Sequence, residues 1–167
     1  MLKAAKVIKK LKLQLNKDEG GYFASTYPPA DTKNPPCSAI YYFLEKEQRS
    51  VLHSVTSDML YHFYCGGPVE MLLLYPKGHV PQTEVCVFSN NLEKGELPMK
   101  VIPAGTWLGS RVKKGAYTLM GVSMAPAFNP DPKFYVIGER DKLIKEYPGR
   151  KKMIIALTKD PNEEAKK

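Results

Sequence analysis

Short apolar segments separated by glycine and proline turns run through most of the chain. Many of them are rich in β-branched and aromatic residues, which favour strands, and no helical pattern interrupts them. About nine strands in succession favour an antiparallel sandwich or barrel over a parallel sheet. We expect a small closed barrel whose interior holds polar side chains and a cavity for a small molecule. The predicted strands are 21–27, 37–44, 51–55, 59–65, 69–75, 84–88, 99–102, 106–112 and 117–124.

Helical patterns occur only near the two ends of the chain. Near the N-terminus, lysines alternate with apolar residues at helical spacing, which predicts a helix that ends before Asp18. Residues 140–147 predict a second short helix that is ended by a Pro-Gly pair. We therefore expect one domain over residues 1–150, including the N-terminal helix, and a polar C-terminal extension over residues 151–167. The apolar stripe of the first helix is Val7, Ile8, Leu11 and Leu15.

The formal net charge of +8 is unevenly distributed over the 167 residues. Six of the 25 basic residues and none of the 17 acidic residues fall within residues 1–17, so 19 basic and 17 acidic residues remain elsewhere. No aromatic residue is interleaved with these N-terminal lysines, which favours the solvent-exposed face of a helix over a phosphate-binding surface. We expect no nucleic-acid partner.

Composition is that of one compact domain, with 43% hydrophobic residues available for a core. No segment approaches the roughly 18 to 20 apolar residues that a membrane span needs, and the N-terminus lacks the apolar centre of a signal peptide. We expect a soluble, cytoplasmic protein without membrane association. The cysteines form no CxxC motif, so we expect buried reduced thiols and neither disulfides nor a zinc knuckle at Cys37, Cys65 and Cys86.

Several short motifs along the chain occur in the order seen in one known family. They are Gly20-Gly21-Tyr22-Phe23, Ser38-Ala39-Ile40-Tyr41-Tyr42-Phe43, His53 followed by Ser57-Asp58, His62-Phe63-Tyr64 before Gly66, Glu70 before Leu72-Leu73, Pro103-Ala104-Gly105-Thr106-Trp107 and Ala125-Pro126 before Phe128. From about Leu11 to Tyr147 the chain resembles the cupins of the cupin-5 type, a domain of unknown function. The resemblance implies no established reaction.

The same resemblance implies a fold and an assembly. The expected fold is all-β with minor helices: a cupin-type double-stranded β-helix, or jelly-roll barrel, with short N-terminal and C-terminal helices. The family usually forms homodimers and has a pocket in the mouth of the barrel.

Cupins that perform chemistry typically hold a divalent metal through two histidines and a glutamate of a first motif and a histidine of a second motif. With His53 in the first position, the other three ligand positions of this chain are apolar: Val55, Met59 and Leu108. Relatives usually have a glutamate at the place of Met59. One imidazole among apolar side chains cannot supply a divalent site, so we expect no metal and no other cofactor.

Strand alternation assigns the residues around Met59 to two faces. Met59, Tyr61 and Phe63 share one face of their strand, which we expect to point into the barrel. His62 and Tyr64 then lie on the outer face, where a structural, hydrogen-bonded histidine is more common than a catalytic one. We expect His79, which follows Gly78 in a loop, to be exposed.

The residues expected around the cavity are aromatic with a few polar groups. Aromatic walls with sparse hydrogen-bonding groups suit a planar or sugar-like ligand, although the same aromatics can simply fill a barrel core. The expected ligand-binding residues are Tyr22, Thr26, Ser38, His53, Met59, Tyr61, Phe63, Glu70, Trp107 and Phe128.

Two classes of function fit these residues. The first is a module that binds a carbohydrate-like or aromatic small molecule and has largely lost its metal site. The alternative is a metal-independent sugar isomerase or epimerase in which His53 is the general base and Tyr61 is the candidate acid. The loss of metal ligands favours the binding module, and no carboxylate that would orient His53 is evident, because Asp58 and Glu70 are near it only in sequence.

Overall fold

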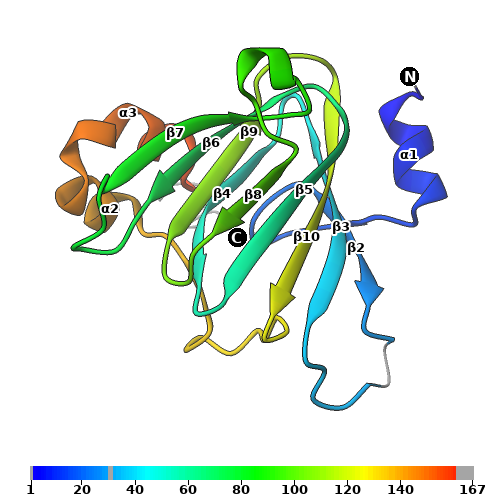
Figure 1. Cartoon of the computed structure of the whole chain (residues 1–167), viewed down its shortest axis with the longest axis horizontal. Helices are drawn as coiled ribbons and strands as arrows, with labels where there is room; N and C mark the ends of the chain where they lie inside the picture. The colour runs from blue at the N-terminus through cyan, green and yellow to red at the C-terminus, as the bar shows by residue number, and fades with distance from the viewer. Residues whose placement is uncertain (1, 30–31, 161–167) are drawn as a thin grey trace.

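A computed structural model describes residues 2–29 and 32–160, whose strands form two antiparallel sheets that face each other (Figure 1). The six-stranded sheet has the order β1-β2-β3-β10-β5-β8. Its strands are β1 (Gln14–Leu15), β2 (Tyr22–Tyr27), β3 (Ser38–Glu45), β5 (Asp58–Gly66), β8 (Met99–Ile102) and β10 (Tyr117–Ala125).

The five-stranded sheet has the order β11-β4-β9-β6-β7. From β3 onward the chain crosses between the two sheets at every connection except that from β6 to β7, which is the topology of a jelly roll. All nine predicted strands are confirmed within one or two residues, and β1 and β11 are additional. The strands of this sheet are β4 (Arg49–Val55), β6 (Val69–Leu74), β7 (Thr83–Phe88), β9 (Trp107–Val112) and β11 (Tyr135–Ile137).

The main core lies between the sheets because alternate side chains of each strand point toward the facing sheet. On β5, Met59, Tyr61 and Phe63 are buried in this core. Tyr64 is 49% exposed, and His62 shares its outer face. The predicted alternation of β5 is confirmed.

Two helices cover the outer face of the five-stranded sheet (Figure 1). They are α2 (Arg140–Glu146) and α3 (Lys151–Ala156), joined by the 3₁₀ turn η2 (Pro148–Arg150). Leu143 of α2 and Ile154 of α3 are buried against Leu52 of β4 and Leu72 of β6. A second apolar cluster therefore forms outside the sheet rather than between the sheets.

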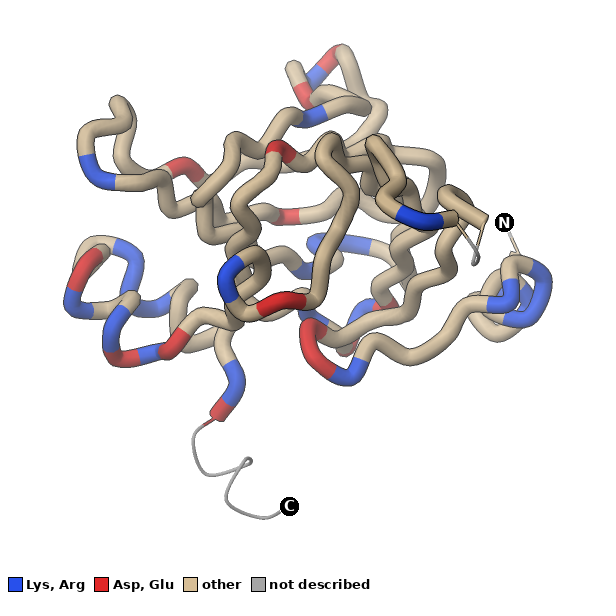
Figure 2. Tube along the Cα trace, turned by 90° about the horizontal axis from the view of Figure 1, so that it is seen from below, with Lys and Arg blue, Asp and Glu red and all other residues tan. Residues whose placement is uncertain are grey.

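Helix α1 (Ala4–Lys10) packs on the outer face of the six-stranded sheet, where Val7 is buried with Phe43 and Tyr117. Its lysines are exposed and gather near the N-terminus in Figure 2, as the sequence predicts. The helix is shorter than predicted, because Lys12 adopts a positive φ of 52° and ends the helical path. Leu15 therefore lies in β1 and is 52% exposed, not on the apolar stripe of the helix.

The expected polar extension over residues 151–167 differs from the structure in its first part. Residues 151–156 form α3, and both Ile154 and Leu157 are fully buried. Because Arg150, Lys151 and Lys152 make this segment look polar in sequence, the prediction overlooks a short amphipathic helix whose apolar side chains face the sheet. Residues 161–167 of this prediction lie outside the described residues.

The two sheets do not close into a single hydrogen-bonded barrel, which corrects the expectation of a closed one. Among the described residues, no strand of one sheet pairs with a strand of the other. An isolated bridge joins Phe88 at the end of β7 to Leu97, which is outside the strands, on either side of η1 (Leu92–Lys94). Loops and side-chain packing join the sheets instead, and this leaves room between them.

The three cysteines are free thiols, as predicted, but each is half-buried rather than buried. In the part of the chain that the structure describes, no helix has the length and apolar content to cross a bilayer.

Candidate functional site

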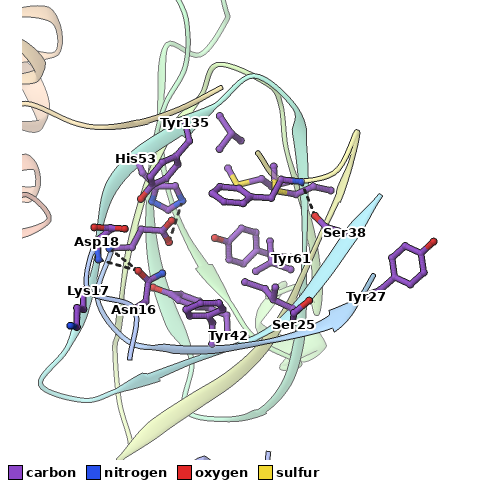
Figure 3. A pocket seen from close by; sticks show the side chains of 18 of the residues that line it. Asn16, Lys17, Asp18, Ser25, Tyr27, Ser38, Tyr42, His53, Tyr61 and Tyr135 are labelled. Atoms are coloured by element: carbon purple, nitrogen blue, oxygen red, sulfur yellow. Dashed lines mark hydrogen bonds and ion pairs between the residues drawn. The ribbon is translucent and has the colours of Figure 1, made fainter. Parts of the chain in front are cut away.

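A cavity of about 530 Å³ lies between the two sheets, within the size range of small-molecule sites (Figure 3). Strands β2, β3, β5 and β10 contribute one wall, and β4 and β11 contribute the other. The segment before β2 and the segment after β10 complete the lining. The lining residues are Leu15, Asn16, Lys17, Asp18, Glu19, Phe23, Ser25, Tyr27, Pro28, Ser38, Ile40, Tyr42, His53, Val55, Met59, Tyr61, Val122, Met124, Phe128 and Tyr135.

A tight loop before β2 positions Glu19 at the cavity. The Asn16 side-chain oxygen accepts hydrogen bonds from the backbone N–H groups of Asp18 (3.2 Å) and Glu19 (3.1 Å). The Gly20 N–H donates to the Asn16 carbonyl at 3.0 Å, and the Glu19 carbonyl accepts from the Val51 N–H at 2.8 Å. These bonds hold the backbone of Glu19 against β4, so its carboxylate has a defined position.

His53 on β4 is the buried imidazole of the cavity, with 4% of its side chain exposed. Its Nδ1 lies 2.9 Å from the Val51 carbonyl oxygen, which can only accept, so Nδ1 carries a proton. Its Nε2 lies 3.8 Å from a Glu19 carboxylate oxygen (Figure 3). When the imidazole is neutral, Nε2 therefore carries no proton, so it and the Glu19 carboxylate oxygen are two neighbouring hydrogen-bond acceptors.

Three tyrosines that line the cavity have raised pKa values. Burial is the main cause for Tyr42, Tyr61 and Tyr135, and the negative charge of Glu19 raises each pKa further. All three are thus held as neutral phenols. The Tyr42 hydroxyl donates to the Gly20 carbonyl at 2.8 Å. The buried Tyr135 hydroxyl has no hydrogen bond of good geometry in the described part of the chain, but the Glu19 carboxylate is an acceptor close enough to it to raise its pKa.

We call Glu19, His53 and Tyr135 the polar end of the cavity. The His53 and Tyr135 rings are 6.1 Å apart between centroids, and Figure 3 shows the two side chains next to each other. The remaining walls are largely apolar and aromatic. Such a site can surround a ring on its faces and bind polar substituents at one end.

Phe128, in the loop after β10, lines the cavity and contacts its polar end at Tyr135. Its ring makes edge contacts with Tyr135 (5.5 Å) and Phe134 (6.1 Å), while 45% of the residue stays exposed. Its N–H donates to the Ser38 hydroxyl at 2.9 Å. Ser38 thus fixes the loop that carries an aromatic side chain over the cavity.

The structure brings half of the residues expected at the cavity into its lining. These are Ser38, His53, Met59, Tyr61 and Phe128. Both candidate catalytic residues, His53 and Tyr61, are among them. The high pKa of Tyr61 makes it a hydrogen-bond donor rather than a ready source of protons near neutral pH.

Two residues expected at the cavity lie on the opposite face of β2. Tyr22 packs against Phe43 under α1, and the exposed Thr26 hydroxyl donates to the Ala39 carbonyl at 2.9 Å. Because side chains alternate along a strand, their neighbours Phe23 and Ser25 line the cavity instead.

Three further residues lie away from the cavity. Trp107 packs in the apolar cluster under α2 and α3, on the outer face of the five-stranded sheet. Glu70 forms an ion pair with Arg111, at 2.6 Å from its Nη2. Phe63 faces the interior but packs against Phe88 (5.8 Å), outside the cavity lining.

Sequence reasoning missed the other two members of the polar end, Glu19 and Tyr135. Glu19 directly precedes the Gly-Gly pair of a family motif, which is the signal that could have indicated it. Tyr135 lies in a three-residue strand after a proline-rich loop and carries no such signal. Asp58, which is near His53 in sequence, instead accepts a hydrogen bond from the Ala104 N–H at 2.8 Å.

The donor set around His53 does not fit the divalent metal of other cupins. Val55 and Met59 line the cavity at two expected ligand positions, and Leu108 pairs with His53 between β4 and β9. None of these side chains offers a lone pair suited to a divalent cation except the weak thioether of Met59. Within residues 2–29 and 32–160, no group of three His, Cys, Asp or Glu residues is arranged to hold a metal ion.

The other two histidines, His62 and His79, make contacts outside the cavity. His62 Nε2 is 2.9 Å from the Ser123 hydroxyl on the neighbouring strand β10. His79 is exposed, as predicted, and stacks on Tyr75 with a centroid distance of 4.0 Å. Neither residue lines the cavity.

The chain matches one family model, and solved structures share its fold. A family model described as Cupin superfamily (DUF985) matches residues 5–133. The chain is 25% identical to a protein from Shewanella oneidensis, with a TM-score of 0.83 over 95% of this chain and 99% of that one. A hypothetical protein from Leishmania major is 21% identical, with a TM-score of 0.82 over 95% and 100% of the two chains.

A more distant cupin structure shares the fold alone. A cupin 2 domain-containing protein from Halorhodospira halophila is 12% identical, with a TM-score of 0.60 over 87% of each chain. No curated protein matches the chain.

Proposed function

The chain belongs to the cupin superfamily (DUF985), and we propose that it binds a carbohydrate-like or aromatic small molecule between its two sheets. The observation that carries the proposal is the cavity of about 530 Å³ with aromatic and apolar walls and one polar end. His53 is buried and lines the cavity, and its Nε2 is 3.8 Å from the Glu19 carboxylate without a hydrogen bond to it; such a side chain is typical of a binding site rather than of a filled core.

A thermal-shift screen with neutral sugars and small aromatic compounds tests the proposal. A ligand at 100 times its Kd should stabilise the fold by about 2.7 kcal/mol. The Ser25→Trp variant should abolish this effect, because Ser25 is an exposed residue of the cavity lining where a large ring would obstruct the space.

Thr26→Trp is the matched control. Thr26 is also exposed and is the next residue of β2, but it lies on the other face. It should keep the stabilisation seen in the unchanged protein. Equal stabilisation of the Ser25→Trp and Thr26→Trp variants would contradict binding in the cavity, and so would the absence of any stabilising compound.

The orientation of His53 favours a second candidate function, a metal-independent isomerase or epimerase. The Nδ1–H bond to Val51 leaves Nε2 free to take a proton from a carbon atom next to a carbonyl group. Glu19, 3.8 Å away, stabilises the imidazolium that keeps this proton, while a second acid donates its own proton to the opposite face of the carbon. Proton exchange with water then returns the imidazolium and the deprotonated acid to their starting states. Tyr61 and Tyr135 are the hydroxyl groups available for that role, although their raised pKa values oppose it.

Solvent deuterium exchange separates the two functions. An isomerase should incorporate deuterium from heavy water into a compound found by the screen, and His53→Gln should stop this exchange while leaving most of the binding. Binding without any exchange in the unchanged protein would leave the binding module as the function.

A further inference from the structure

The polar end of the cavity is rich in hydrogen-bond acceptors and lacks fixed positive charge. His53 Nε2 and the Glu19 carboxylate lie 3.8 Å apart, too far for a hydrogen bond to each other, so a donor atom from a third group can reach both. If His53 is protonated, its imidazolium donates toward Glu19, and the carboxylate still has oxygen lone pairs that accept. In both protonation states this end accepts hydrogen bonds from a ligand.

Positive side chains that could balance an anion do not face this end. Among the described residues, Lys17 is the only lysine or arginine in the cavity lining; it is exposed, and in Figure 3 it lies at the rim. Arg49 is not part of the cavity lining, and its Nη2 reaches the Thr158 carbonyl at 3.4 Å. An anionic group next to Glu19 would therefore meet an uncompensated like charge.

Tyr135 provides an independent observation that points to a ligand. Its hydroxyl is buried and lines the cavity, and no hydrogen bond of good geometry satisfies it in the described part of the chain, although the Glu19 carboxylate is an acceptor close enough to raise its pKa. A buried hydroxyl without such a bond is costly, which favours a ligand group that completes its bonding. Since its pKa is raised, the phenol keeps its proton and can donate to an oxygen atom of the ligand.

We infer that the polar end binds an uncharged hydroxyl group of the ligand and excludes carboxylates and phosphates. A hydroxyl group can donate to Glu19 or His53 and accept from Tyr135 at the same time, whereas a carboxylate can only accept. This inference rests on the proposed function and narrows it to alcohols and sugars whose bound end is neutral. Any anionic part of the ligand would have to remain at the rim near Lys17.

Two matched pairs of probes test the inference: benzyl alcohol against benzoate, and methyl β-D-glucopyranoside against methyl β-D-glucuronide. Within each pair the ring is kept and a hydroxymethyl group becomes a carboxylate. Affinities come from protein-observed NMR titrations, which also report whether His53 is perturbed. We expect the neutral member of at least one pair to bind at least about tenfold more tightly than its anion.

Glu19→Gln should reduce this preference, because it removes the repelling charge and keeps a similar shape. Asp18→Asn removes the same charge from the adjacent, exposed residue of the lining and should leave the preference nearly unchanged. An anion that binds as tightly as its neutral partner would overturn the inference but keep the cavity function. The same conclusion would follow if the preference survived in the Glu19→Gln variant. Failure of all four probes to bind would contradict the cavity function and the inference together.

Discussion

Glu19 acts on four titratable side chains of the cavity at once. It lies 3.8 Å from His53, and its charge raises the pKa values of Tyr42, Tyr61 and Tyr135. Its position depends on the backbone of the loop that carries it, which is bonded to β4 and to the Tyr42 hydroxyl. At the scale of single residues, the chemistry of the cavity therefore depends on a loop that contributes little to the core.

Gly20→Ala should displace that loop. Gly20 has a φ of +95°, and an added Cβ would overlap the backbone carbonyl of Arg49. Gly78→Ala is the matched control, since its φ is +96° and no heavy atom lies within 4 Å of an added Cβ. Both variants incur the strain of a left-handed residue, about 1 to 2 kcal/mol, but only Gly20→Ala should also weaken ligand binding.

Chemical denaturation and ligand titration of the two variants separate these effects. Equal loss of stability in both, with unchanged ligand affinity for Gly20→Ala, would show that the loop does not position the site.

Among the strands, the sequence predicts the bounds well, but it predicts which face points inward correctly for β5 and not for β2. On β5, buried and exposed residues alternate, and the interior face was correctly predicted. On β2 both faces carry apolar residues, since Tyr22 packs under α1 while Phe23 lines the cavity. Because neither face of β2 is uniformly polar, the sequence does not show which face points inward, so Tyr22 and Thr26 could not be distinguished from Phe23 and Ser25.

Helix α3 and the residue after it are also hard to predict, because buried apolar residues lie within a strongly basic segment. Leu157→Ala should lower the free energy of unfolding by about 2 to 5 kcal/mol, because Leu157 is fully buried in the cluster outside the five-stranded sheet. Ile155→Ala, at a position that is 42% exposed, should change it by less than about 0.5 kcal/mol.

Denaturant titrations of the Leu157→Ala and Ile155→Ala variants measure this difference. Similar small changes in both would mean that residues 151–157 behave as the polar extension predicted from sequence.

At the scale of the whole molecule, the strand count and turn pattern were sufficient to predict a two-layer β fold, and the family motifs were sufficient to predict the jelly roll. The cavity depends on long-range packing, because Glu19 and Tyr135 are separated by more than a hundred residues in sequence. No local sequence pattern indicates that Glu19 and Tyr135 lie close together in the fold. The homodimer, the cytoplasmic location and the absence of a nucleic-acid partner stay predictions.

The most direct test of the cavity as a ligand site is a crystal structure of the protein with the compound that stabilises it most. We predict electron density for the compound between the two sheets, with a hydroxyl group within hydrogen-bonding distance of Glu19 or His53. A compound bound on an outer face, or a cavity filled by repacked side chains, would contradict the account.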